Sequence, residues 1–193
     1  MTDRPLSRRD ISHERIVDAA ARAIRRSGYA GTGVADIMKE AGLTHGGFYA
    51  HFESRDALLA EAVAKAGQGN AAWLDHQLKA LSRAGASPLR ALVESYLSDA
   101  HLAATESGCV VSALSSEMPR QAPVVREASA MRVQGLIKRV QAALPAGAEP
   151  AEAALIASTL VGALQLSRAA GGDRQGKAML KSVREALITQ YDR

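Results

Sequence analysis

The 193-residue chain contains a single cysteine, Cys109, and its aromatic residues amount to only 4% of the sequence. One cysteine excludes a disulfide within the chain, as is usual in a reducing compartment. The first ten residues are polar, and no apolar run with a cleavage pattern follows them. We therefore expect no secretory signal and a cytoplasmic protein.

Long hydrophobic runs are also scarce. The most apolar stretch, residues 151–166, is shorter than the roughly 20 residues that cross a bilayer, and it contains Ser158, Thr159 and Gln165. We expect a buried helix there and no membrane partner. With 47% hydrophobic and 23% charged residues, the composition is that of an ordinary globular protein.

Motifs of catalysis and metal binding are absent from the sequence. It has no HExxH or CxxC motif, no glycine loop following a strand, and five histidines that are not spaced as a metal set. Asp36 and Glu40 lie one helical turn apart, but we expect both on the outer side of a short helix, where they are solvated. The sequence predicts no enzyme, no metal site and no cofactor.

The charge balance points weakly to a polyanionic partner. The formal net charge is +4, a bias that many enzymes share. Basic residues gather at the N-terminus as Arg4, Arg8 and Arg9. We expect residues 1–10 to form a flexible basic tail, which is either simply solvated or reaches a phosphate or a minor groove.

Helical periodicity recurs along the chain, and no segment has a convincing strand pattern. Ser12 and Ser54 are the predicted caps of two helices, the second ending at a break over residues 67–69. Ser87 with Pro88 opens another helix. A further helical stripe consists of Leu74, Leu78 and Leu81, and a short apolar segment runs over residues 109–118. Apolar residues at helical spacing over 133–144 mark a long amphipathic helix, and the last two helices are expected at about residues 151–170 and 177–190. The fold class is therefore all-α, with about nine helices.

Residues 32–52, TGVADIMKEAGLTHGGFYAHF, have the layout of two short helices joined by a tight turn. Thr32 is placed to cap the first helix, and Gly42 can take the left-handed conformation that ends it. Thr44 is placed to cap the second. A helix-turn-helix of this size is typical of DNA-binding proteins, in which the N-terminal residues of the second helix meet the base edges.

The second helix has an unusual composition for a segment that needs only to be stable. Gly46 and Gly47 each cost about 1 kcal/mol relative to alanine, but they leave backbone that can approach another polymer closely. Tyr49 and His51 add donors suited to phosphate oxygens. Phe48 either contacts bases or packs into the core, and core packing is the more natural role for an aromatic residue near a helix end.

The motifs of residues 11–59 together resemble the DNA-binding domain of the TetR family of bacterial transcription regulators. They are GY at 28–29, DI at 36–37, AG at 41–42, FYAHF at 48–52 and SRDALL at 54–59. The resemblance implies a helix-turn-helix domain over residues 11–54, and a larger helical domain for ligand binding and dimerisation over residues 55–193. It also implies a homodimeric repressor of a palindromic operator.

Two positions depart from the family pattern. Gly33 stands where a second Ser or Thr is frequent, and Arg55 stands where Lys is commoner, which keeps the positive charge. The predicted DNA-binding residues are Thr32, Gly33, Thr44, His45, Gly46, Gly47, Phe48, Tyr49, His51 and Arg55.

The last two helices carry the predicted dimer contacts. One has a face of mostly small residues and the next an apolar face, so two copies could form a four-helix interface. An internal core is the alternative. The predicted interface residues are Ala154, Ser158, Gly162, Leu166, Leu180, Val183, Leu187 and Tyr191.

The middle helices are expected to hold the signal site, since the resemblance implies a small-molecule inducer that binds there. The candidate residues are Cys109, His101, Trp73, Tyr96, Met118 and Met131. Each is alternatively plain core. His101 needs a ligand or an internal partner. Cys109, at a predicted helix start, is either an electrophile or redox sensor or an inert buried thiol. A helical small-molecule-binding protein without operator-specific regulation is the alternative function.

Overall fold

A computed structural model describes residues 7–192, and the regular secondary structure over that range is entirely helical. The all-α prediction is therefore confirmed, and nine α-helices lie among these residues. In chain order, with η marking 3-10 helices, the elements are α1 (Arg8–Ser27), α2 (Val34–Glu40), η1 (His45–Ala50), α3 (Arg55–Arg83), α4 (Pro88–Tyr96), α5 (Asp99–Ala103), α6 (Val110–Leu114), η2 (Met118–Arg120), α7 (Pro123–Ala143), α8 (Pro150–Ala169) and α9 (Arg174–Tyr191).

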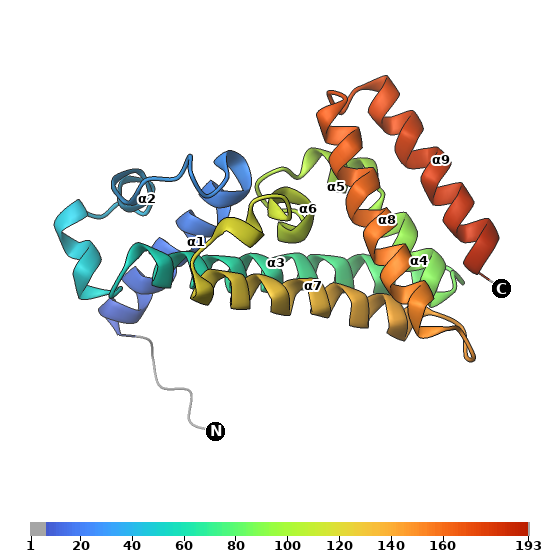
Figure 1. Cartoon of the computed structure of the whole chain (residues 1–193), viewed down its shortest axis with the longest axis horizontal. Coiled ribbons are helices and arrows are strands. Elements are labelled where there is room, and N and C mark those ends of the chain that lie inside the picture. Colours follow the sequence, from blue (N-terminus) through green and yellow to red (C-terminus); the bar gives the residue numbers. More distant parts are fainter. Residues whose placement is uncertain (1–6, 193) are drawn as a thin grey trace.

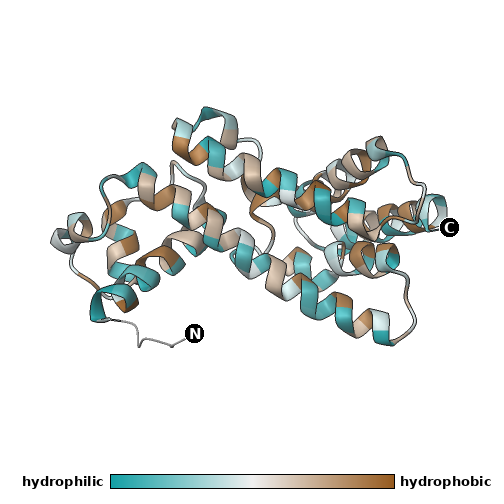
Figure 2. Ribbon diagram, turned by 90° about the horizontal axis from the view of Figure 1, so that it is seen from below, coloured by the Kyte–Doolittle hydropathy of each residue, from teal (hydrophilic) through white to brown (hydrophobic). Residues whose placement is uncertain are grey.

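The molecule is elongated, with two long helices along its length. In Figure 1, α3 and α7 lie side by side, α1 and α2 gather at one end, and α8 and α9 stand together at the other. Figure 2 shows hydrophobic and hydrophilic residues interspersed along these helices, as amphipathic packing requires. The long helices thus connect the predicted DNA-binding end with the C-terminal pair.

The α8 helix is long and apolar enough to pass as a membrane span by length and composition alone. Core helices of soluble proteins pass the same test. Here α8 packs against α7 and α9, and Ile156, Leu160 and Leu164 are completely buried. The sequence-based expectation of a packed helix agrees with this arrangement.

The first helix begins earlier than the sequence analysis predicts. Ser7, rather than Ser12, is its cap: the Asp10 amide donates to the Ser7 hydroxyl at 3.2 Å, and the Asp10 carboxylate accepts from the Ser7 amide at 3.0 Å. This reciprocal capping box outweighs the local pattern at Ser12. Arg8 and Arg9 therefore belong to α1 and not to a tail, whereas Arg4 lies outside the described residues.

Two further helix boundaries need correction. Gly33, not Thr32, caps α2; Thr32 is buried, and its hydroxyl donates to the Gly28 carbonyl at 2.7 Å. The predicted break at residues 67–69 is also wrong, since α3 continues without interruption to Arg83. Neighbouring helices supply enough contact to hold the glycines in helical form. The caps predicted at Ser54 and Ser87 are confirmed.

Glu117, next to η2, connects the segment after α6 to the turn that follows α1. Its carboxylate accepts the Tyr29 amide at 3.0 Å. Gly28 has a φ of +72°, and a Cβ there would lie 2.5 Å from a Glu117 oxygen. Only glycine combines this left-handed backbone with so close an approach.

We predict that Glu117→Ala lowers the free energy of unfolding by about 1 to 2 kcal/mol, because it leaves a partly buried amide without its acceptor. Urea denaturation followed by circular dichroism measures the change. Glu127→Ala, at an exposed position of α7, is the matched control and should stay within about 0.5 kcal/mol of the original protein. Equal losses of unfolding free energy in the two variants would contradict a stabilising role for the hydrogen bond between Glu117 and the Tyr29 amide.

Candidate DNA-binding and signal sites

The side chains of Phe48 and Phe52 are buried in the core beneath the helix-turn-helix motif. Their exposed fractions are 2% and 3%, and their rings stack with centroids 5.6 Å apart. Phe48 is therefore a core residue, and its place among the predicted DNA-binding residues is wrong. Its burial fixes the orientation of η1, which decides what the neighbouring residues present to solvent.

The residues around these two phenylalanines form an exposed surface at one end of the molecule. Tyr49 is 75% exposed and meets Phe48 edge-on at 5.2 Å, while Thr44, His45 and Gly46 are also exposed. A Cβ at Gly46 would meet nothing within 4 Å, so another polymer can approach the backbone there. We call Thr44, His45, Gly46 and Tyr49 the reading surface.

The second motif helix differs from its prediction in type. It is a 3-10 helix, and the Thr44 side chain forms no capping hydrogen bond. Two adjacent glycines weaken an α-helix, and the tighter 3-10 form is common in short pieces. Gly47 is half-buried, and a Cβ there would meet the end of Met38 at an ordinary contact distance of 3.8 Å.

His51 lies beside the reading surface but is only partly exposed. Its Nδ1 is buried without a hydrogen-bond partner. Burial lowers the pKa of His51 below 6.5, and the charges of His13 and Arg9 lower it further. The lowered pKa favours the neutral ring in the free protein, and a neutral ring still offers one N–H to a phosphate.

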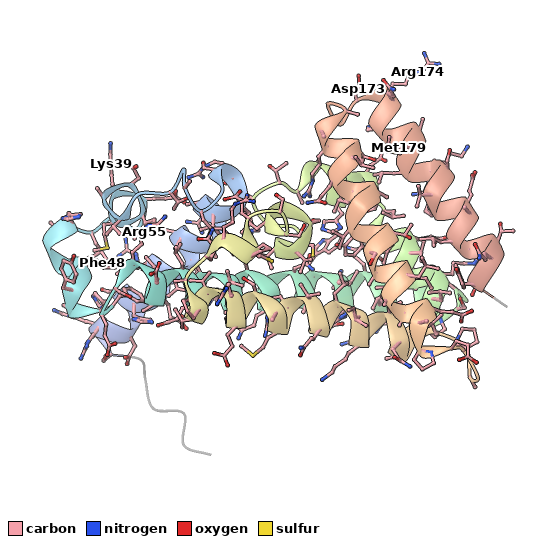
Figure 3. All side chains as sticks on the ribbon, viewed as in Figure 1. Lys39, Phe48, Arg55, Asp173, Arg174 and Met179 are labelled. Atoms are coloured by element: carbon pink, nitrogen blue, oxygen red, sulfur yellow. The ribbon has the colours of Figure 1, made fainter. Side chains whose placement is uncertain are left out.

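Arg55 and Thr32 hold the motif together from inside the protein. Nη2 of Arg55 donates to the carbonyls of Tyr29 and Thr32. Thr32 is 3% exposed, so its predicted contact with DNA is wrong, whereas Gly33 beside it is exposed. Figure 3 shows Arg55, Phe48 and Lys39 at the same end of the molecule. Exposed Lys39, which the sequence analysis did not select, adds a positive charge there.

The candidate signal residues divide between two cavities and the core. Cys109 and Met131 line a cavity of about 160 Å³ between α3, α6 and α7, which we call the α3–α7 cavity. Trp73 and His101 line one of about 240 Å³ between α1, α3 and the segment after α5, which we call the α1–α3 cavity. Tyr96 and Met118 are buried and line neither.

The predicted dimer residues also fall into two groups. Ala154, Ser158 and Leu166 of α8 are exposed, and Gly162 is partly so. On α9, Leu180, Leu187 and Tyr191 are at most 7% exposed and Val183 is half-buried. The α9 stripe faces the protein's own core, since α9 packs on α4 and α8, so this part of the predicted dimer interface is wrong.

Comparison with known proteins identifies the family. The sequence pattern described as bacterial regulatory proteins of the tetR family matches residues 16–62. An HTH-type transcriptional regulator of Mycobacterium tuberculosis, itself uncharacterised, is 31% identical over 166 residues, which cover 80% of this chain and 83% of that protein. The chain belongs to the TetR family of transcriptional regulators.

Solved TetR-family structures share the fold over nearly the whole chain. A regulator from Cytophaga hutchinsonii has a TM-score of 0.77 at 16% identity, covering 98% of this chain and 100% of that one. The reduced form of Escherichia coli NemR has a TM-score of 0.71 at 19% identity, covering 90% and 95%. The likeness extends beyond the helix-turn-helix to the helices that follow α3.

Within this TetR-family protein, His101 is satisfied by internal partners. Its Nδ1 donates to the Tyr96 carbonyl at 2.7 Å, and its Nε2 accepts the Cys109 amide at 2.9 Å. Burial lowers the pKa of His101 to about 4. The ring is neutral at pH 7, and of the two roles open from the sequence the structure supports an internal partner. Cys109 stands at the N-cap position of α6, the helix start that the sequence predicts; its side chain forms no capping hydrogen bond and the residue is only 4% exposed.

Two arginines that the sequence analysis did not select hold the segment between α5 and α6, residues 104–109, which we call the linking loop. Arg168 of α8 donates to the carbonyls of His101 at 2.7 Å and Ala104 at 3.2 Å. Arg25 of α1 donates to the carbonyls of Glu106 at 2.5 Å and Ala66 at 3.3 Å. No sequence motif marks either residue, because their partners are backbone atoms of distant segments.

We predict that His101 makes stability fall as the solution is acidified. The unfolded chain binds a proton at His101 near pH 6.5, but the folded chain does so only near pH 4. Between these values protons favour the unfolded state by up to about 3 kcal/mol. His101→Gln removes this titration, so urea denaturation from pH 7 to pH 4 should show a shallower loss. Identical losses would contradict the prediction.

Proposed function

We propose that this TetR-family protein is a homodimeric repressor that binds a palindromic operator through its reading surface and is released by a small-molecule or electrophile signal in the regulatory domain. The observation that carries the proposal is the reading surface itself, in which buried Phe48 holds Tyr49 and the backbone of Gly46 outward. The setting is the cytoplasm, and no catalytic role is assigned.

The exposed Tyr49 hydroxyl can donate a hydrogen bond to a phosphate oxygen, and the backbone at Gly46 can come close to the DNA groove because no side chain covers it. Tyr49 has no competing burial, and Thr44 and His45 lie at the N-terminal end of η1, the end that meets base edges in helix-turn-helix proteins. Lys39 on α2 adds positive charge on the same end, which favours duplex DNA over a neutral partner.

The exposed side of α8 supports the dimer. Leu155 and Leu166 are 53% and 60% exposed and flank Ser158 and Gly162, so an apolar face with small central residues is left open. On α9 one exposed stripe is small, Ala178, Ser182 and Thr189, and charged Lys181 and Glu185 are exposed on the same helix. We assign these faces of α8 and α9 to the interface, in place of the buried α9 stripe. A two-fold dimer would present two reading surfaces to half-sites roughly 34 Å apart.

Because the operator sequence is unknown, the test begins with selection of bound duplexes from a random DNA library. We expect enrichment of one palindromic site. Enrichment of no site would refute operator binding and leave a helical small-molecule-binding protein as the remaining alternative.

On the selected site, Tyr49→Phe should weaken binding about tenfold, since one hydrogen bond to a charged phosphate contributes about 1.5 kcal/mol. Fluorescence anisotropy at fixed salt measures the affinity. This substitution keeps the aromatic ring, so thermal unfolding should be unchanged, whereas Phe48→Ala should lower stability by about 3 kcal/mol or more through loss of core packing. An unaltered operator affinity in the Tyr49→Phe variant would remove Tyr49 from the interface.

For the dimer, Leu166→Glu should produce monomers, because it replaces one of the two exposed leucines that flank the α8 face by a charge that the interface would bury. Sedimentation velocity measures the assembly state, and operator affinity should fall with it. Val124→Glu is the control, because it changes a similarly exposed apolar residue of α7 away from this face. A dimer that survives Leu166→Glu would show that α8 does not form the interface.

A further inference from the structure

The α1–α3 cavity lies where the DNA-binding end meets the regulatory helices, and its charge is unbalanced. Arg22 and Arg25 of α1 and Lys65 of α3 line it, against one carboxylate, Asp18. His101 also lines it but is neutral at pH 7, because burial lowers its pKa to about 4. The wall of the cavity is therefore cationic.

Two of the three cations already have carboxylate partners. Lys65 pairs with Asp18 at 3.4 Å, and Arg22 pairs with Glu40 at 3.0 Å. Arg25 differs, since it donates only to the uncharged carbonyls of Glu106 and Ala66, and none of the described carboxylates forms an ion pair with it. Its Nη2 takes part in neither hydrogen bond.

Arg25 is partly buried, and this burial lowers its pKa to about 10; the charge of Arg22 also lowers the pKa, whereas the nearby Glu106 carboxylate raises it. The side chain stays protonated at pH 7 under these influences. A partly desolvated cation without a carboxylate in ion-pair contact is unfavourable, and an anion placed beside it would be stabilised by a charge-assisted hydrogen bond. The cavity thus has one position where a negative charge is favoured.

The other side of the cavity is aromatic. Trp73 is half-buried, and its ring lies 5.2 Å from the ring of His101. Gly69, one helical turn before Trp73, also lines the cavity, and a Cβ there would meet nothing within 4 Å. The open side of Gly69 leaves room for a flat group against the indole.

Size limits the occupant. The volume of about 240 Å³ lies below the roughly 300 to 1,000 Å³ of pockets for drug-sized ligands. One aromatic ring with one acidic group is of the right scale, whereas a nucleotide or a long acyl chain is too large.

We propose that the α1–α3 cavity binds a small aromatic carboxylate, with the carboxylate at Arg25 and the ring against Trp73. The proposal rests on the proposed function only for its regulatory consequence. Arg25 belongs to α1, which packs against α2 of the DNA-binding motif, and it also donates to the Glu106 carbonyl of the linking loop. A carboxylate that competes with the Glu106 carbonyl for Arg25 weakens the hydrogen bond between α1 and the linking loop. This change would alter the affinity for the operator.

Binding is tested first on the full-length protein without DNA. Trp73 is the only tryptophan in the chain, so its fluorescence reports on this cavity. Titration with benzoate and phenylacetate should give a saturable fluorescence change and saturable heat in calorimetry. Benzamide has the same shape without the charge, and it should bind at least tenfold more weakly. Absence of saturable binding by both carboxylates, or equal binding of benzamide, would overturn the proposal.

The location is tested by filling each cavity in turn. Gly69→Leu fills the α1–α3 cavity, and Gly135→Leu fills the α3–α7 cavity, where a Cβ also meets nothing within 4 Å. Both replace a helix-interior glycine, which favours folding by up to about 1 kcal/mol. Calorimetry should show carboxylate binding lost in the first variant and kept in the second. The reverse pattern, or binding kept in both, would overturn the assignment.

The selected operator separates this proposal from the proposed function. Carboxylate binding without any operator binding would refute the repressor and leave the ligand site standing. Operator binding without carboxylate binding would refute the ligand site alone. If both hold, benzoate should shift operator affinity in the original protein and in Gly135→Leu, and should leave it unchanged in Gly69→Leu; an unchanged affinity in the original protein would overturn the regulatory consequence.

Discussion

The linking loop, residues 104–109, is held from both sides by arginines that donate to its backbone. Arg168 reaches it from α8, the helix with the open apolar face, and Arg25 reaches it from α1, the first helix of the DNA-binding end. A guanidinium that spans several carbonyls is a rigid connection, because its donors have fixed geometry. The position of the reading surface relative to the C-terminal helices depends on these hydrogen bonds from Arg168 and Arg25 to the linking loop.

Further hydrogen bonds, from His101 and Glu117, hold the segments around the linking loop in place. His101 accepts the amide of Cys109, the last residue of the loop, and donates back to Tyr96. Glu117 adds a second tie between the regulatory helices and the end of α1. A ligand that binds Arg25 would therefore weaken one of the few hydrogen bonds that connect α1 and the turn after it to the segments after α5. Small changes at such a joint can move a distant surface, since packed interfaces shift between discrete arrangements.

Sequence reasoning succeeded where the cause of a structure is local. Gly42 has a φ of +70° at the predicted turn, Ser54 caps α3, and Tyr49 is exposed, as a contact with phosphate requires. It failed where other parts of the chain determine the structure. The capping box at Ser7 starts α1 before the predicted cap at Ser12, and the apolar stripe of α9 packs on α4 and α8 of the same chain instead of forming a dimer face. An apolar stripe has the same appearance whether it packs on its own chain or on a second copy.

The roles of Arg25, Arg168 and Glu117 had no sequence signal, because each bonds to backbone of a segment far away along the chain. The most direct measurement of the central claim is hydrogen exchange in Arg168→Gln, with Arg120→Gln as an exposed control. We predict exchange about tenfold faster or more in both the linking loop and the C-terminal turn of α1, from the loss of about 1.5 kcal/mol or more of charged hydrogen bonding. Faster exchange in the loop with α1 unchanged would contradict the claim that the loop joins the two ends.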